Sequence, residues 1–330
     1  LHRINAEFVD WASQQAKPGR WLHAGEAEVF FDDTEIEVEG HKFEGARINY
    51  EGNRALSWQT LWYGPWLLDG ILDGAGDVSE HLGVLLDEHQ PRWQERPSYF
   101  YADSGSSAGK FINRIEQAGF TRWSVSYNKW TDKLDRFAAE VPESQWSALP
   151  PADQRQEQYA WVKHQPGECQ QAQRFAVARW KNDGDLMWHY AYVVGKAAET
   201  GSPQGVFERH RLKGAKEQGF SEVLSGLDLH HPPCQDLIAN QAFYALAMLA
   251  YNLLITLKLL DLPEDAQTWR IRTTIRYLLT VPVSVSRHAR YEVARICIPA
   301  GWLRWWRLFV DQWVPKRKPG RPTVEEVDSA

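Results

Sequence analysis

The order of the secondary-structure elements predicted over residues 27–127 constrains the fold of this chain more than any other feature of its sequence. Strand-like runs are recognised by β-branched and aromatic residues bounded by turn residues, and helices by apolar residues three or four positions apart. On these criteria the chain contains, in order, strands at 27–38, 43–50 and 55–63, a helix at 78–88, a strand at 98–102, a helix at 109–118 and a strand at 122–127. The turn at Glu51–Arg54 suits a hairpin, so the first three strands are predicted to form an antiparallel meander.

A different pattern begins after Asn128. The chain then contains three predicted strands of an inserted antiparallel sheet and a predicted helix, over 158–164, 173–180, 188–195 and 207–227. A long apolar helix is predicted over 239–260. Because Asn252 and Lys258 interrupt its apolar run, we expect a buried helix rather than a membrane span.

This order of strands and helices resembles the ribonuclease-H-like fold. The predicted fold class is α/β: a ribonuclease-H-like mixed sheet flanked by helices, interrupted by an antiparallel β insertion and followed by a helical C-terminal part. Because the chain opens on Leu1 in what looks like the end of a helix, we expect a truncated N-terminal region. The expected boundaries are 1–26 for its remnant, 27–130 and 206–262 for the two parts of the core, 131–205 for the insertion, 263–315 for a basic helical region and 316–330 for a disordered tail.

Charge is unevenly distributed along the chain. The net charge is −6, yet the segment from Thr268 to Arg321 has 12 Arg or Lys against two acids, so it carries +10 and the remainder −16. This segregation favours a C-terminal part that faces a polyanion, although a solvated basic face has the same composition. The three cysteines form no CxxC pair, which supports neither a zinc site nor a disulfide framework and is typical of a cytoplasmic protein.

Four acidic residues are candidates for chemistry. Asp103 follows the strand at 98–102, at the position where α/β proteins place functional side chains, although it could equally cap the next helix. Asp32 and Asp33 lie within a strand-like run, where a carboxylate is costly unless it is paired, coordinated or turned outward at a bulge. Glu217 lies on a predicted helix among basic residues, which is also the pattern of an ordinary charged helix face. Together, two strand acids and one helix acid would form a carboxylate cluster suited to a hard cation such as Mg²⁺.

These residues resemble the motifs of the DDE insertion-sequence transposases, in the subgroup with a β-sheet inserted between the second Asp and the Glu. The resemblance spans roughly residues 27–260 and rests on an ordered set of segments: 31–34 (Phe-Asp-Asp-Thr), 101–105 (Tyr-Ala-Asp-Ser-Gly), 213–217 (Lys-Gly-Ala-Lys-Glu), 239–243 and 250–253. It implies that Asp32, Asp103 and Glu217 are the catalytic and metal-binding acids, with Asp33 as the alternative first acid. The implied cofactor is a pair of Mg²⁺ ions, for which Mn²⁺ could substitute.

The resemblance implies an enzyme that cleaves DNA at transposon ends and transfers the freed strand into target DNA. Its partners would be double-stranded DNA, as terminal inverted repeats and target, and a second copy in a synaptic homodimer, with no membrane. The family often has Tyr and Arg seven and four residues before the Glu, where this chain has His210 and Lys213, and Leu224 stands where Lys is common. These departures leave open a transposase-derived DNA-binding protein without catalytic activity.

Several side chains are expected to contact DNA. Lys213, Lys216 and Arg211 would position backbone phosphates near the acids, and His210 occupies a related motif position. Trp180 and Trp188 of the inserted sheet could stack on a splayed base, as could Trp161, although a core position is the commoner place for each tryptophan. The abundance of Trp and acids leaves a carbohydrate-active protein as a further alternative, which the basic C-terminal part fits poorly.

Overall fold

The computed structural model describes residues 1–74, 78–128, 134–148, 155–196, 201–288 and 291–313. Within these ranges it leaves out the side chains of 78–80, 148, 155, 215–217, 288, 291 and 309–313. The tail predicted at 316–330 lies outside the described residues. The chain divides into two compact units, Leu1–Asn252 and Leu253–Ala330, which are described separately.

The core of the N-terminal unit is a mixed sheet built around β1 (Ala27–Glu37). On one side β1 pairs antiparallel with β3 (Arg54–Tyr63), which pairs antiparallel with β4 (Trp66–Gly74). On the other side β1 pairs parallel with β5 (Ser98–Ala102), and β5 pairs parallel with β6 (Arg122–Ser126). Three antiparallel strands followed by two parallel ones is the ribonuclease-H-like order, so the predicted fold class is confirmed.

The predicted meander was wrong in its choice of strands. Residues 43–50 contribute only the two-residue β2 (Arg47–Ile48), and the third core strand is β4. Gly64, with φ of +58°, turns the chain between β3 and β4. Trp66, Leu67 and Leu68 are all fully buried, so β4 has apolar residues on both faces and lacks the alternation that identifies a half-buried strand.

The segment between β6 and residue 203 adds strands to the same sheet. Antiparallel strands β8 (Arg155–His164), β9 (Gln173–Asn182) and β10 (His189–Val194) follow a short β7 (Ser147–Ala148). β10 pairs with β6 through Val193–Ser126 and Val194–Val125. The predicted insertion is therefore an antiparallel extension of the core sheet, giving ten strands in the described part of the unit.

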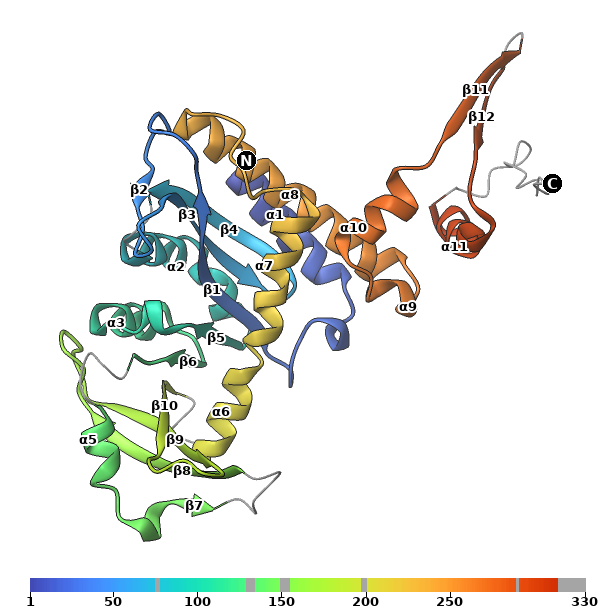
Figure 1. Cartoon of the computed structure of the whole chain (residues 1–330). Coiled ribbons are helices and arrows are strands. Elements are labelled where there is room, and N and C mark those ends of the chain that lie inside the picture. Colours follow the sequence, from blue (N-terminus) through green and yellow to red (C-terminus); the bar gives the residue numbers. More distant parts are fainter. Residues whose placement is uncertain (75–77, 129–133, 149–154, 197–200, 289–290, 314–330) are drawn as a thin grey trace. The chain divides into compact units, whose positions relative to one another are not determined.

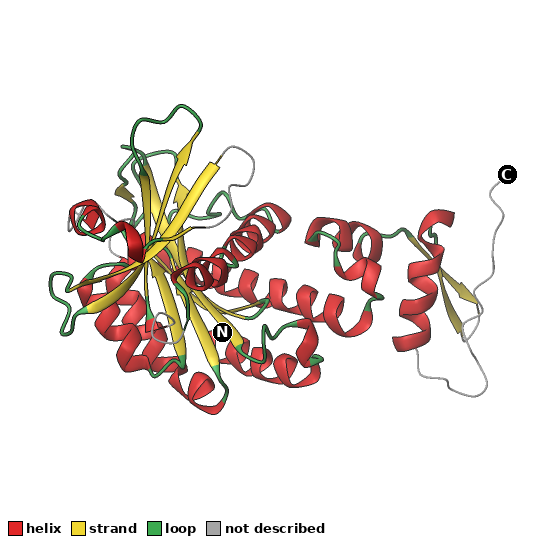
Figure 2. Ribbon diagram, turned by 90° about the horizontal axis from the view of Figure 1, so that it is seen from below, coloured by secondary structure: helices red, strands yellow, loops and turns green. Residues whose placement is uncertain are grey.

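Helices cover both faces of this sheet (Figure 2). On one face α2 (Val78–Glu95) and α3 (Gly109–Ala118) enclose a ring cluster in which Phe120 stacks on Trp93 and contacts Phe100. On the other face lie α6 (Pro203–Arg211) and α7 (Gly214–Gly226), and Phe220 of α7 contacts Phe30 and Trp62. Figure 1 shows α6 and α7 following one another across that face.

Two further helices complete the N-terminal unit. α1 (His2–Gln15) lies along β4, where the buried Asn5 amide donates to the carbonyl oxygens of Leu67 and Leu68. The start of α8 (Leu237–Asp261) packs on β3 through Tyr244 against Trp58. In the described chain α8 alone is long and apolar enough to cross a membrane, but half of its most apolar stretch is buried, as in the core helix of a folded domain. Short elements are 3-10 turns at Pro18–Arg20, Ser104–Ser106 and Glu143–Gln145 and the helix α5 (Leu134–Ala139).

The C-terminal unit has a small aromatic core. Trp269 lies edge-on to Trp305 and to Tyr277, and Trp306 donates its indole N–H to the Tyr277 carbonyl oxygen. These tryptophans therefore hold the unit together. Its elements are α9 (Glu264–Gln267), α10 (Ile271–Thr274), a π-turn (Ile275–Leu279), the antiparallel pair β11 (Val283–His288) and β12 (Tyr291–Ile296), a 3-10 turn (Ala300–Trp302) and α11 (Leu303–Trp313).

Candidate active site

Two of the predicted acids lie side by side where the parallel ladder between β1 and β5 ends, Asp32 in the middle of β1 and Asp103 just after β5. Phe31 of β1 and Ala102 of β5 are the last registered pair of the parallel ladder. Asp32 and Asp103 each follow directly, and Asp103 keeps an extended backbone, with φ of −87° and ψ of −170°. The register of the two strands therefore places Asp32 and Asp103 at adjacent positions.

The register also distinguishes Asp32 from Asp33. Side chains alternate across a strand, and registered partners share a face. Phe30 contacts Phe220 of α7, and its partner Tyr101 lies beside the His210 ring of α6, so these residues mark the α6–α7 face. Two positions further along, Asp32 and Asp103 fall on that face. Asp33 falls on the opposite face.

The electrostatics agree with a close pair of carboxylates. Burial, and next the charge of Asp103, raise the pKa of Asp32 to about 7, with a further contribution from Asp33. The positive charge of Lys213 acts in the opposite direction. Burial and the Asp103 charge also raise the pKa of Asp33. A carboxyl group such as Asp32, whose ionisation is disfavoured by burial and by a neighbouring acid, is a donor that a divalent cation would satisfy.

Asp103 also has the capping role that its sequence position allowed. Its Oδ1 accepts a hydrogen bond from the Gly105 backbone N–H at 2.8 Å, at the start of the Ser104–Ser106 turn. Asp32 Oδ1 accepts from the backbone N–H of Asp33 at 3.1 Å. Each acid is thus held by the backbone next to it, so the pair is oriented by the fold.

Lys213 lies at the junction of α6 and α7, close to the acids. Its side chain is nearly buried, and its Nζ lies 5.6 Å from the centre of the Phe30 ring. Because its charge lowers the pKa of Asp32, the ammonium and carboxylate interact across the α6–α7 face. The backbone of Glu217 is part of α7, but the side chains of Lys216 and Glu217 lie outside the described residues.

His210 is more deeply placed than a DNA-contacting residue would be. Its Nδ1 lies 2.8 Å from Ser124 Oγ and its Nε2 lies 2.7 Å from Ser126 Oγ, both on β6. Burial, and then the charge of Lys213, lower its pKa to about 4, so the ring is neutral at pH 7. Arg211 by contrast is 57% exposed and forms an ion pair with Glu157 at 3.0 Å.

The predicted tryptophans are partly buried rings of the insertion, Trp161 on β8, Trp180 on β9 and Trp188 just before β10. Trp180 stacks on His189 at 5.6 Å between ring centres. Trp188 lies against the guanidinium of Arg179, 4.4 Å from its ring centre, and Trp146 covers the same guanidinium at 4.1 Å. Arg179 is itself buried, a position that no feature of the sequence indicated. Trp161 packs on the cluster formed with α6 and is covered by the Arg174 guanidinium at 4.2 Å.

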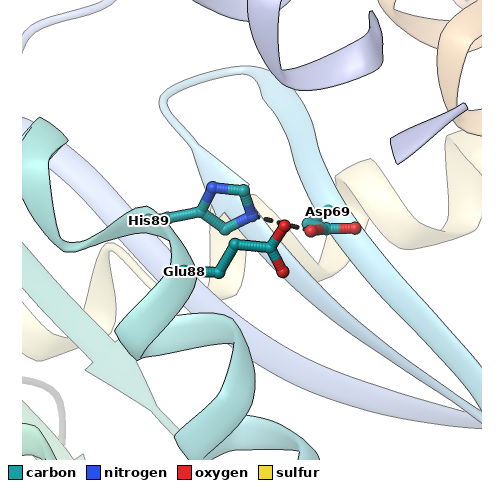
Figure 3. Close-up of side chains that lie close together, drawn as sticks. All are labelled: Asp69, Glu88 and His89. Carbon is teal, nitrogen blue, oxygen red and sulfur yellow. Dashed lines mark hydrogen bonds and ion pairs between the residues drawn. The ribbon is translucent and has the colours of Figure 1, made fainter. Parts of the chain in front are cut away.

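A second acidic cluster lies on the other face of the sheet, between β4 and α2 (Figure 3). It is the one group of three His, Asp or Glu side chains in the described residues with ligand spacing, and it comprises Asp69, Glu88 and His89. His89 Nε2 lies 2.7 Å from Asp69 Oδ2, and Arg92 donates to His89 Nδ1 at 2.8 Å. A guanidinium only donates, so His89 carries its proton on Nε2 and has no lone pair there for a metal. The sequence reasoning missed this cluster, which fits a structural hydrogen-bond network.

The model of the family "Transposase DDE domain group 1" matches residues 67–303, well over half of the chain. The chain belongs to this family. It is a transposase, as its sequence motifs predicted, and transposases of the DDE family bind DNA and generally use divalent metal ions. Among curated proteins the chain has no significant match.

The match to the transposase model covers only part of the proposed site. It includes Asp103 and the position of Glu217, but it begins within β4, after β1 and Asp32. The case for the first acid therefore depends on the pairing of β1 with β5 in this structure.

Proposed function

We propose that this transposase cleaves DNA at transposon ends and transfers the freed strand to target DNA, with Asp32, Asp103 and Glu217 as its catalytic acids. The observation that carries the proposal is the adjacency of Asp32 and Asp103 on the α6–α7 face, one residue beyond a registered strand pair. Asp33 belongs to the opposite face, which makes it the weaker candidate for the first position.

Helical spacing supports Glu217 as the third acid. In α7, position 217 is four residues after Lys213 and three before Phe220. Residues three and four apart share one side of a helix. Lys213 and Phe220 both contact Phe30 of β1, so that side of α7 faces the strand that carries Asp32.

The donor set fits divalent cations. Carboxylate oxygens are the ligands that Mg²⁺ prefers, and Asp32, Asp103 and Glu217 would hold a pair of Mg²⁺ ions, or Mn²⁺ in their place. When bound, such ions lower the pKa of an attacking water and stabilise the leaving oxygen of a phosphodiester. The protein itself fixes the two aspartates through backbone hydrogen bonds to Asp33 and Gly105.

The other residues predicted to contact DNA differ in how exposed their side chains are. Arg211 is accessible for a phosphate, and Lys213 would bring its charge to a phosphate held beside Asp32. Lys216 is proposed as a further phosphate contact. His210, hydrogen-bonded to Ser124 and Ser126, would act by holding the α6–α7 junction on β6.

The proposal also includes stacking of a DNA base on tryptophan and the assembly of two copies of the chain. Trp180 and Trp188 present partly buried rings that could receive a base on the inserted strands. We also propose a homodimer on DNA, because a transposon has two ends to be joined.

The test is Mg²⁺-dependent nicking of a duplex that carries the element's own terminal repeat. Wild-type protein should nick it, and Asp32→Asn and Asp103→Asn should bind the duplex but not nick it. Binding without nicking by the wild type, in Mg²⁺ and in Mn²⁺, would instead support the transposase-derived DNA-binding protein, which the departures at His210 and Leu224 allow.

A further inference from the structure

The hairpin of β11 and β12 extends from the helices of the C-terminal unit and exposes apolar side chains (Figure 1). Its base joins the aromatic core, because Val281 and Ile298 pack on the core cluster of that unit. Further along the strands, Val283, Val285 and Ile296 are 51%, 63% and 43% exposed. A two-stranded hairpin is marginally stable by itself in water, and exposed apolar side chains add to that cost. A partner that covers these side chains would therefore stabilise the hairpin.

The strand register separates the side chains of the hairpin onto two different faces. Successive residues of a strand alternate between faces, and registered partners share a face. One face, called the hairpin face here, carries three registered pairs: Val283 with Ile296, Val285 with Ala294, and Arg287 with Glu292. The opposite face carries the pairs Ser284–Arg295 and Ser286–Val293. The hairpin face is thus apolar over two pairs and ends in one cation and one anion.

The charges of the hairpin face suit a copy of the same face. Arg287 Nε donates to Glu292 Oε1 at 2.6 Å, and the two side chains are 84% and 61% exposed. A guanidinium has five N–H donors, so this one bond leaves Arg287 able to bind a second carboxylate. One cation and one anion that lie side by side can pair with an identical couple turned by half a rotation. The hairpin face is therefore complementary to itself in charge.

A two-fold axis parallel to the strands would also match the apolar side chains. It would set β11 of one copy over β12 of the other, so the residues that pair within one hairpin would meet again between the two hairpins. A contact of this symmetry uses the same surface on both copies, and each of its interactions occurs twice. The contacts would be Val283 with the partner's Ile296, Val285 with the partner's Ala294, and Arg287 with the partner's Glu292.

We propose that the hairpin face docks on the hairpin face of a second copy of this chain, with the two-fold axis parallel to the strands. This inference rests on the proposed function, because it gives the proposed homodimer on DNA a contact surface. A second copy suits the face better than DNA does, since its apolar pairs offer nothing to a phosphate and its one cation is balanced by an acid. Six side chains a copy form a small contact, of the weak class that buries less than about 1,200 Å² in total. Two copies held on one DNA complex would form it more readily, because their effective concentration is higher.

The experiment measures self-association of the full chain by sedimentation equilibrium, at chain concentrations up to about 100 μM. Arg287→Glu and Glu292→Arg each place like charges within one hairpin and across the proposed contact. Each variant alone should dissociate about tenfold more readily than the wild type. An equimolar mixture of the two should associate with roughly wild-type affinity, because the new carboxylate of one variant then faces the new guanidinium of the other. Each hairpin in the mixture still carries like charges, so only a contact between copies explains this recovery.

A second pair of variants tests the apolar part of the hairpin face. Val285→Asp places a carboxylate in the middle of that face, where the second copy would bury it, and should weaken self-association by about tenfold or more. Ser284→Asp is the matched control, because Ser284 is the preceding residue of β11 and belongs to the opposite face. It should change self-association by less than about twofold.

The outcomes distinguish this contact from the proposed function. A wild type that stays monomeric, a mixture that associates no better than its components, or unchanged self-association in Val285→Asp overturns the hairpin contact and leaves the proposed DNA cleavage standing. Loss of duplex binding in Val285→Asp alone, with self-association unchanged, would assign the face to DNA and also overturns the contact. Recovery in the mixture, with no nicking by the wild type, supports the contact and counts against the proposed function.

Discussion

Asp32 and Asp103 occupy equivalent positions on two parallel strands, each one residue past the registered pair Phe31–Ala102. The charge of Asp103 disfavours the ionised form of Asp32, and the burial of Asp32 adds to that cost. A fold that keeps such a pair stores an unfavourable interaction that a bound cation would relieve.

The first prediction compares the two candidate first acids. Asp32→Asn should abolish nicking, whereas Asp33→Asn, on the opposite face, should retain most of it. In metal-free buffer at pH 8 Asp32→Asn should also raise the unfolding free energy by roughly 1–2 kcal/mol, because it removes a charge that burial and Asp103 disfavour. Chemical denaturation measures the second effect independently of activity. Loss of nicking in Asp33→Asn alone would reverse the assignment.

The second prediction concerns Lys213. Its charge opposes the repulsion at Asp32, so Lys213→Gln should lower the nicking rate by about tenfold or more. Arg211→Gln is the matched control, because Arg211 is exposed and forms its ion pair with Glu157. It should weaken DNA binding uniformly and reduce the salt dependence by about one phosphate contact, without changing the rate at saturating DNA. Equal rates for the two variants would argue against a role for Lys213 beside the acids.

The third prediction is a pH dependence of stability caused by His210. Its pKa is about 4 in the folded chain and about 6.5 when unfolded, so the unfolded chain binds the extra proton between these values. The His210 contribution is fully present above pH 6.5 and is lost as the pH falls to 4, by up to about 3 kcal/mol. His210→Gln should flatten this part of the stability profile measured by urea unfolding. A profile with the same slope in wild type and variant would contradict the buried neutral ring.

The fourth prediction treats the Asp69 cluster as structural. Burial would raise the pKa of Asp69, but hydrogen bonds from His2 and His89 outweigh it and hold that pKa below its usual value. Asp69→Asn should therefore destabilise the protein by about 3 kcal/mol, because the buried His89 would lose the carboxylate to which it is hydrogen-bonded. A chelator should not change the difference in unfolding midpoint between wild type and Asp69→Asn. Metal-dependent protection of wild type that Asp69→Asn lacks would show that the cluster binds an ion.

The sequence predicted what depends on local patterns. Strand β5 with its terminal acid, and the helices on either side, follow from aromatic and apolar spacing bounded by turn residues. The sequence did not predict β4, because a strand that is buried on both faces lacks the alternation of apolar and polar residues. It also left Asp32 and Asp33 unresolved, since only the pairing of β1 with β5 decides which side chain shares a face with Asp103.

The same limit applies to buried polar residues. His210 matched a motif position expected to contact DNA, and its two serine partners lie more than eighty residues earlier in the chain, on β6. In the sequence, Arg179 is one more basic residue beside a tryptophan. In the fold, its guanidinium lies between the rings of Trp146 and Trp188. Long-range partners of this kind have no signature in a single sequence.

The last prediction concerns the loop of residues 167–170 in the insertion, which Asn113 of α3 holds by hydrogen bonds to Glu168 and Gln170. Gly109→Ala should destabilise the protein by about 1–3 kcal/mol, because the new Cβ would lie 2.0 Å from the Gly167 carbonyl oxygen and 2.5 Å from the Cys169 nitrogen. Both are backbone atoms, so the loop itself must move. Gly19→Ala, which meets nothing within 4 Å, should change the unfolding free energy by less than about 0.5 kcal/mol. Chemical denaturation compares the two, and hydrogen exchange should show the loss of protection in Gly109→Ala at the Gln170 amide, whose proton is donated to Asn113. An unperturbed Gln170 amide would mean that the loop does not depend on this close approach.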